Sequence, residues 1–204
     1  MSSFDQRAQT WDENPIHLNR AIAIAEKIKE NINLESIESA LEYGAGTGDL
    51  SFLLKDSIKS ITTMDSSREM VRVTVEKLSK MSISNVHPMY MDLETSSYTA
   101  QTFDLLFMQM VLHHISDVKV FLSKCYNLIN PNGILAIADL FKEDGSFHGA
   151  GFNGHLGFDV DVLSNMLEAI GYKNIKQEEC YTMKRTLELG EMKEFPIFLL
   201  IATK

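Results

Sequence analysis

The feature that most constrains this chain is a run of three glycines, Gly44, Gly46 and Gly48, which alternate with small residues. The run follows a short apolar stretch and precedes a helical-looking segment that begins near Asp49. Glycine reaches backbone angles that other residues avoid, so such a strand-to-helix turn lets a ligand lie against bare backbone at the helix start. A dinucleotide fingerprint, Gly-x-Gly-x-x-Gly, would need glycine where Asp49 stands, so the spacing disfavours that ligand class.

Apolar patterns over the first 140 residues predict strands that alternate with helices. The run at 103–108 is almost continuously apolar, as expected of a strand buried on both faces. The predicted strands are 37–43, 61–65, 86–91, 103–108 and 134–140, and the predicted helices are 21–32, 49 onward, 66–81 and 118–128. This alternation predicts a parallel sheet flanked by helices.

Two local signals set boundaries between these elements. Ser66 or Ser67 is expected to cap the helix that runs to residue 81, with Glu69 as the capping-box partner of Ser66. The sequence Asn-Pro-Asn-Gly at 130–133 is a strong turn signal, which we expect to precede the fifth strand.

The last third of the chain changes character. A glycine-rich loop at 145–157 precedes a predicted helix, 160–170, and two β-like runs follow at about 175–183 and 195–203. Strands joined without a crossover helix should pair antiparallel. The predicted fold is therefore α/β: a doubly wound, mostly parallel seven-stranded sheet with a C-terminal antiparallel hairpin. At 204 residues it fits a single domain, residues 1–204.

Two segments outside the sheet are predicted to border a site. Residues 1–35 are expected to form an N-terminal helical cap or lid, with Phe4 and Trp11 as its apolar contacts. An equally good interpretation of Trp11 is that it packs the first helix onto the sheet. Residues 141–160 form a candidate substrate loop.

Charge and composition exclude several function classes. Acidic residues outnumber basic ones by 28 to 19, a net charge of −9, which disfavours a nucleic-acid binder or a protein that binds anionic membranes. The sequence predicts neither a membrane-spanning segment nor a signal peptide. Cys125 and Cys180 lie far apart in the sequence and form no metal-type pair. Together these features predict a cytoplasmic protein.

Candidate binding residues follow the predicted strands at their carboxyl ends, where open α/β sheets bind ligands. The glycine loop comes after the first strand, and Glu42 lies two residues ahead of it. The second strand ends at Asp65 and the third at Asp92, while the fourth runs to Met108. All of these positions should converge on one crevice.

The residue types at these positions suit a nucleoside that carries an amino-acid group. Asp65 has two acceptor oxygens for the vicinal hydroxyls of a ribose. Asp92 can accept a hydrogen bond from an exocyclic amine such as that of adenine, and Leu93 offers a backbone N–H. Glu42 and Asp49 can meet a cationic amino-acid portion. The loop holds no Lys or Arg, and no Gly-Lys-Ser/Thr follows it, so a P-loop is excluded.

Five blocks, in order and spacing, resemble the successive motifs of class I S-adenosylmethionine (SAM)-dependent methyltransferases of the small-molecule type. They are residues 41–49, 63–71, 89–93, 103–117 and 128–139, and the stretch 103–117, with its His-His pair, is especially similar. The resemblance implies SAM as cofactor and transfer of its sulfonium methyl to an acceptor. The cofactor-binding residues that it implies are Glu42, Gly44, Gly46, Gly48, Asp65, Ser66, Asp92, Leu93 and Met108.

Three histidines are candidates for a catalytic role. His113 and His114 follow the fourth strand, near the methyl-transfer crevice that the resemblance implies, and His155 lies in the candidate substrate loop. A histidine of near-neutral pKa can act as a general base, although packing or loop hydrogen bonding is the commoner role for such a pair. The seven-residue separation of His148 and His155 matches no standard metal spacing, so no metal site is predicted.

The sequence thus predicts a SAM-dependent methyltransferase with a small-molecule acceptor and no nucleic-acid or membrane partner. The acceptor and the oligomeric state are not readable from it. The alternative is a protein that binds SAM without turnover, as a sensor or as a partner subunit. A nicotinamide oxidoreductase is a third option, which Asp49 already disfavours.

Overall fold

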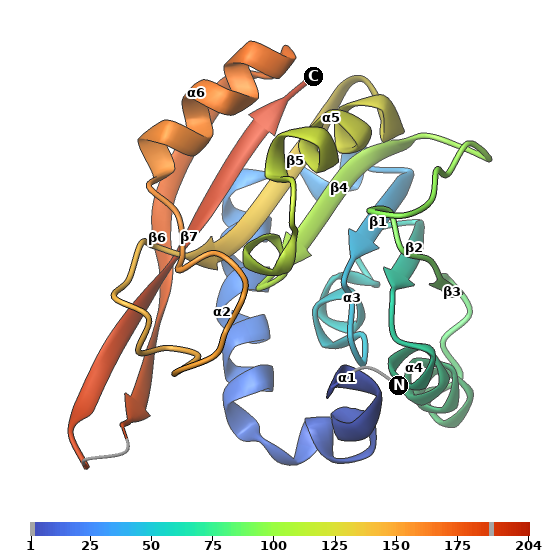
Figure 1. Ribbon diagram of the computed structural model, residues 1–204. Helices are drawn as coiled ribbons and strands as arrows, with labels where there is room; N and C mark the ends of the chain where they lie inside the picture. Colours follow the sequence, from blue (N-terminus) through green and yellow to red (C-terminus); the bar gives the residue numbers. More distant parts are fainter. Residues whose placement is uncertain (1–2, 188–189) are drawn as a thin grey trace.

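The computed structural model describes residues 3–187 and 190–204, which form one seven-stranded sheet with helices on both faces (Figure 1). Residues 1–2 of the predicted N-terminal segment lie outside the described residues. The strands are β1 Ser39–Tyr43, β2 Ser60–Asp65, β3 Val86–Tyr90, β4 Phe103–Gln109, β5 Ile129–Leu140, β6 Lys173–Thr186 and β7 Met192–Thr203. The helices are α1 Ser3–Arg7, α2 Pro15–Asn31, α3 Asp49–Leu54, α4 Arg68–Met81, α5 Val118–Leu128 and α6 Val160–Ile170. Short 3-10 helices are η1 Ala8–Glu13, η2 Leu34–Ser36 and η3 Leu112–His114.

The strand order is β3-β2-β1-β4-β5-β7-β6. The five strands from β3 to β5 are parallel to one another, whereas β7 is antiparallel to both β5 and β6. This confirms the predicted doubly wound sheet with its C-terminal antiparallel hairpin. The chain leaves β1 toward β2 and β3 and later returns to place β4 on the other side of β1. A crevice opens at the carboxyl ends of strands where the order reverses in this way.

Alternating side chains divide the core into two layers, because successive residues of a strand face opposite sides of the sheet. Ala40 and Leu105 pack with α2 and α3, while their neighbours Leu41 and Leu106 pack with α5 and α6. Both faces are thus covered, which explains why strands such as β4 are apolar throughout. None of the helices in the described ranges is long and apolar enough to cross a membrane.

Helix α2 begins six residues earlier than the predicted start at residue 21. Asn14 caps this helix by accepting a hydrogen bond from the backbone N–H of Ile16, and Pro15 occupies the first helical turn. Both are ordinary start signals. The prediction followed the apolar stripe alone, and that stripe begins later because no residue of the first turn is buried.

The capping prediction for α4 was half right. Ser67 is the N-cap and accepts from the backbone N–H of Met70, at 3.2 Å. Ser66 therefore lies outside the helix, and the capping box with Glu69 does not form. Glu69 instead pairs with Arg72 one turn along the helix, at 2.9 Å.

The turn signal at 130–133 lies inside β5 instead of ahead of it. The pairing with β4 moves from Phe103↔Ile129 to Leu105↔Ile134. The register therefore advances by five residues along β5 but by only two along β4. Asn132 takes a left-handed backbone angle, with φ of 65°. The residues do turn, as their types predict, but as a bulge within a longer strand.

Candidate functional site

A cavity of about 750 Å³ opens at the carboxyl ends of the central strands. The glycine loop after β1 and the end of β2 form one wall, and the segment after β4 forms another. The N-terminal residues Phe4 and Trp11 contribute from one side, and Phe147 and Phe152 of the candidate substrate loop contribute from the other. The crevice expected from the strand order is therefore present, and it is bordered by both segments that the sequence singled out.

The glycine loop presents bare backbone to this cavity. Gly44 and Gly46 both have positive φ, 67° and 56°, in a region of backbone angles that residues other than glycine rarely adopt. A Cβ on Gly44 would overlap the side chain of Val111, whereas a Cβ on Gly46 would find only the Trp11 indole nitrogen, at 3.9 Å. The loop is therefore packed at Gly44 and open at Gly46, where a ligand can approach the main chain.

Asp65 fixes the shape of this loop. Its carboxylate accepts a hydrogen bond from the backbone N–H of Gly46, at 2.8 Å, and another from that of Ser67, at 2.7 Å. Burial raises the pKa of Asp65, and these two hydrogen bonds oppose that shift. Asp65 and Ser66 both line the cavity. Each carboxylate oxygen keeps acceptor capacity for a ligand hydroxyl.

Asp92 lines the cavity as predicted. Its carboxylate accepts from the backbone N–H of Glu94, at 2.8 Å, and from the Thr95 hydroxyl, at 3.0 Å, which sets the turn after β3. The neighbouring Leu93 is buried, and its N–H donates to the Tyr43 hydroxyl, at 3.3 Å. The backbone N–H expected to serve a ligand is therefore already bonded within the protein.

Glu42 lies behind the glycine loop and is not part of the cavity wall. It is fully buried and accepts hydrogen bonds from the backbone N–H and the hydroxyl of Ser51, on α3. Burial raises the pKa of Glu42 to about 8. Asp49 likewise points away from the cavity, into an ion pair with Lys77 at 2.7 Å. Both carboxylates stabilise the strand-to-helix connection.

Three further predicted residues lie behind the wall. The Met108 side chain faces the core layer formed with α5 and α6, because it alternates with Phe107 along β4. Gly48 caps α3 with a φ of 87°. The ring of His155 bonds to the carbonyl of Ile115, at 3.0 Å, outside the cavity lining. The predicted residues that do line the cavity are Gly44, Gly46, Asp65, Ser66, Asp92, His113 and His114.

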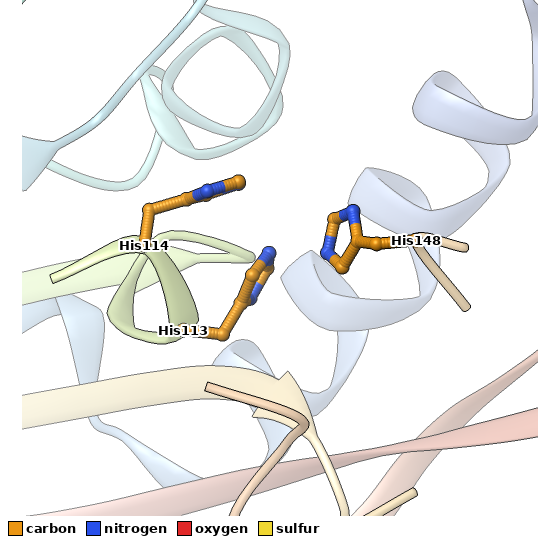
Figure 2. A group of neighbouring side chains, drawn as sticks. All are labelled: His113, His114 and His148. Carbon is orange, nitrogen blue, oxygen red and sulfur yellow. The ribbon is translucent and has the colours of Figure 1, made fainter. Parts of the chain in front are cut away.

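His113 and His114 approach a third histidine, His148, within the cavity (Figure 2). His113 is buried, and its Nδ1 lies 2.6 Å from the Asp139 carboxylate at the end of β5. Burial, reinforced by the neighbouring His113, lowers the pKa of His114 to about 3 and that of His148 to about 4. His114 and His148 are therefore neutral at physiological pH.

Three arginines line the cavity, Arg7, Arg20 and Arg185, and the sequence interpretation missed all of them. Arg20 is buried on α2, and its Nε has no hydrogen-bond partner among the described residues. Burial lowers its pKa to about 10, so it still carries a positive charge. Arg185 reaches the same cavity from β6. A signal for Arg20 did exist, because it continues the buried stripe of Ile24 and Ile28 at four-residue spacing.

Apart from Arg7, which lies over the Phe4 and Trp11 rings of the N-terminal segment, the charged side chains divide the cavity into two regions. Asp65, Asp92 and Glu94 come from the β2–β3 side of the sheet, while Arg185 comes from β6 at the opposite edge. Arg20 lies toward the same side as Arg185, since the two largest charge interactions of Arg20 are with Asp139 of β5 and Tyr181 of β6. One region thus suits hydroxyl and amine donors, and the other suits an anion.

Comparison with known proteins decides the family. Residues 41–137 match the family described as "Methyltransferase domain". An uncharacterised methyltransferase of Schizosaccharomyces pombe is 30% identical over 152 residues, which are 67% of this chain and 54% of that protein. This chain belongs to the class I SAM-dependent methyltransferases. The chain spans about half the length of that fungal relative.

Two solved structures share the fold of this chain. A complex of DhpI with SAH has a TM-score of 0.74 and 20% identity, covering 98% of this chain and 92% of that chain. Phosphoethanolamine N-methyltransferase 2 of Haemonchus contortus, with phosphomonomethylethanolamine and S-adenosylhomocysteine, has a TM-score of 0.70 and 15% identity. That match covers 91% of this chain and 52% of the nematode chain. At these identities the likeness concerns the fold alone.

Proposed function

We propose that this protein transfers the methyl group of SAM to a small anionic acceptor. The observation that carries the proposal is the Asp65 carboxylate bonded to the open glycine loop at Gly46, inside a cavity at the reversal of strand order. Family membership makes SAM the cofactor to test first. The cavity, at about 750 Å³, is roomy enough for a nucleoside and a small acceptor together.

In this proposal the acidic region binds the cofactor. Asp65 would accept hydrogen bonds from the ribose hydroxyls with the lone pairs that Gly46 and Ser67 leave free. Asp92 would accept one from the adenine amine. SAM supplies the intrinsic reactivity, since its sulfonium methyl passes to a nucleophile without further activation of the cofactor. The protein then contributes chiefly position and orientation.

The basic region would bind the acceptor. Arg20 and Arg185 present guanidinium groups, which suit carboxylate or phosphate because they donate paired hydrogen bonds. The nematode structure of the same fold holds a phosphate ester, so small phosphate esters and carboxylates are the first acceptors to screen. Replacing Arg20 with Met should raise the KM for such an acceptor. The matched control is Arg72→Met, at an exposed pair with Glu69.

The N-terminal segment would act as a lid over the bound cofactor. Asp12 accepts from the Thr47 hydroxyl in the glycine loop, at 2.6 Å, and Asp5 accepts from the Ser67 hydroxyl, at 2.6 Å. Phe4 and Trp11 line the cavity beneath these contacts. A few polar contacts and two aromatic rings can form and break at low cost, as closure requires.

The rival is a SAM-binding protein without turnover, which would keep the same cofactor region. Incubation with methyl-labelled SAM and fractionated small molecules separates the two. Label should pass to an anionic fraction with the native protein and not with Asp65→Ala. If the native protein binds SAM yet labels no fraction of any charge, the rival is correct.

A further inference from the structure

Three histidines from two distant parts of the chain converge on one point. His113 and His114 belong to η3, directly after β4, and His148 comes from the loop after β5. Figure 2 shows the three rings gathered around a common space. One ring nitrogen of each lies within 4.8 Å of those of the other two. The cluster lies on the wall of the cavity.

The spacing of the rings fits a tetrahedral metal site. The ring centroids are 4.2 Å apart for His113 and His114, 4.9 Å for His113 and His148, and 5.5 Å for His114 and His148. Two histidines bound to one zinc ion at about 2.05 Å stand with their centroids roughly 5 Å apart and their ligand nitrogens about 3.3 Å apart. The rings are thus already at the right separation. The ring nitrogens, now within 4.8 Å of one another, would have to approach to about 3.3 Å when they bind the ion.

Asp139 gives the cluster the outer partner that metal-binding histidines usually have. Its buried carboxylate lies 2.6 Å from Nδ1 of His113, and it also accepts from the backbone N–H of His113, at 3.2 Å. An ionised carboxylate requires Nδ1 of His113 to carry the proton, which leaves the Nε2 lone pair free. Metal-ligating histidines are oriented by carboxylates in this manner.

The third histidine carries an unexplained polar atom. Nε2 of His148 is buried and has no hydrogen-bond partner among the described residues. A buried nitrogen without a hydrogen-bond partner destabilises the folded protein, and a bound ligand would remove that cost. Stacking of the His148 ring on Phe152, with centroids 3.8 Å apart, holds the ring in place beside the other two.

We propose that His113, His114 and His148 bind a divalent transition-metal ion of the zinc type, with Asp139 orienting His113. Imidazole is a preferred ligand of such ions, and three protein ligands leave the fourth position open. That position opens on the cavity, so it is available to water or to a donor atom of a bound small molecule.

The sequence interpretation excluded a metal because it compared His148 with His155, and that pair does not come together. His155 bonds to the carbonyl of Ile115 instead. It lies on the same loop as His148, only seven positions away. His155→Ala is therefore a matched control for His148→Ala.

The test is zinc titration of tag-free, chelator-treated protein against a chromophoric competitor, without SAM. We expect one Zn²⁺ per chain for the wild type and His155→Ala, and at least about a tenfold weaker affinity for His114→Ala and His148→Ala. Co²⁺ should give a tetrahedral visible spectrum that His148→Ala loses. Thermal unfolding checks that each variant is folded.

A further variant separates ligation from packing. His148→Cys should keep Zn²⁺ binding and add a thiolate-to-cobalt absorption band, which a merely structural role for His148 cannot produce. The proposal is overturned if the folded wild type binds no Zn²⁺ at micromolar concentration. It is equally overturned if His148→Ala binds Zn²⁺ as tightly as His155→Ala. Either result stands whether or not the protein transfers methyl groups.

Discussion

The carboxylate of Asp65, at the end of β2, accepts a hydrogen bond from the backbone N–H of Gly46, at 2.8 Å. The second strand thereby holds the loop that follows the first strand. A second bond, to the N–H of Ser67, ties the same carboxylate to the start of α4. One half-buried acid thus orders the three segments that meet at the acidic region of the cavity.

Replacing Asp65 with Asn should weaken cofactor binding as well as the fold. An amide has one acceptor oxygen, so one of the two N–H groups loses its partner, at a cost of about 1–3 kcal/mol. We expect the affinity for S-adenosylhomocysteine to fall at least about tenfold, as measured by calorimetry.

Asp104→Asn is the matched control for that variant. Asp104 accepts from the backbone N–H groups of Glu38 and Ser39 with one oxygen and from the Asn130 side-chain amide with the other, so Asn there also leaves one donor unpaired. It lies at the amino end of β4, away from the cavity. It should lose similar stability and keep the cofactor affinity. Equal loss of affinity in both variants would contradict a binding role for Asp65.

Alanine at Gly46 should block the ligand without disturbing the core. The left-handed backbone costs about 1–2 kcal/mol for alanine, yet the new Cβ meets no protein atom closer than 3.9 Å. Gly151→Ala is the control, because Gly151 also has a left-handed backbone, with φ of 89°, and a Cβ there would meet no atom within 4 Å. Denaturant unfolding should give the two variants similar stability, while only Gly46→Ala loses cofactor binding. Unchanged binding in Gly46→Ala would place the cofactor elsewhere.

Much of the fold could be predicted because it follows from local patterns. Continuous apolar runs marked the buried parallel strands, and the lack of a helix between the last two runs marked the hairpin. The order of the strand ends also placed Gly44, Gly46, Asp65 and Asp92 correctly in one crevice. These residues lie at strand ends, where topology alone decides the location.

The rest of the site depends on information that a linear sequence does not carry. Met108 ends a predicted strand, but side-chain alternation turns it into the core. Arg20 and Arg185 reach the cavity from α2 and β6, and His148 reaches it from a loop. Their positions depend on how distant elements pack against one another, which no local spacing encodes.

Glu42 should make stability depend on pH. Its pKa is about 8 in the folded protein against an ordinary value of 4.5, so the folded state holds a proton that the unfolded state releases. This contribution is fully present below about pH 4.5 and is lost as the pH rises through 8. Glu42→Gln removes it. The Tm of the variant should therefore rise relative to the wild type, by several degrees, between pH 5 and pH 8.

Thermal unfolding at four pH values across that range checks the Glu42 prediction. Glu35→Gln, at an exposed position, is the control and should show no such trend. A constant difference in Tm between Glu42→Gln and the wild type would contradict a protonated Glu42 in the fold.

Trp11 offers a direct signal for the proposed lid. It is the single tryptophan of the chain, it lines the cavity, and its ring stacks on His17 with centroids 4.1 Å apart. Cofactor bound at Gly46 would lie against its indole nitrogen. Intrinsic fluorescence should change saturably with S-adenosylhomocysteine and not with NAD. If the fluorescence of Trp11 does not change at saturating ligand, the N-terminal segment does not contact the bound cofactor.

Calorimetric titration of the wild-type protein with SAM, and separately with NAD, tests the central claim most directly. The account predicts one SAM per chain and no heat of binding with NAD, because the glycine spacing and Asp65 suit a nucleoside without a pyrophosphate. Binding of NAD in place of SAM, or no binding of SAM by the folded protein, would contradict it.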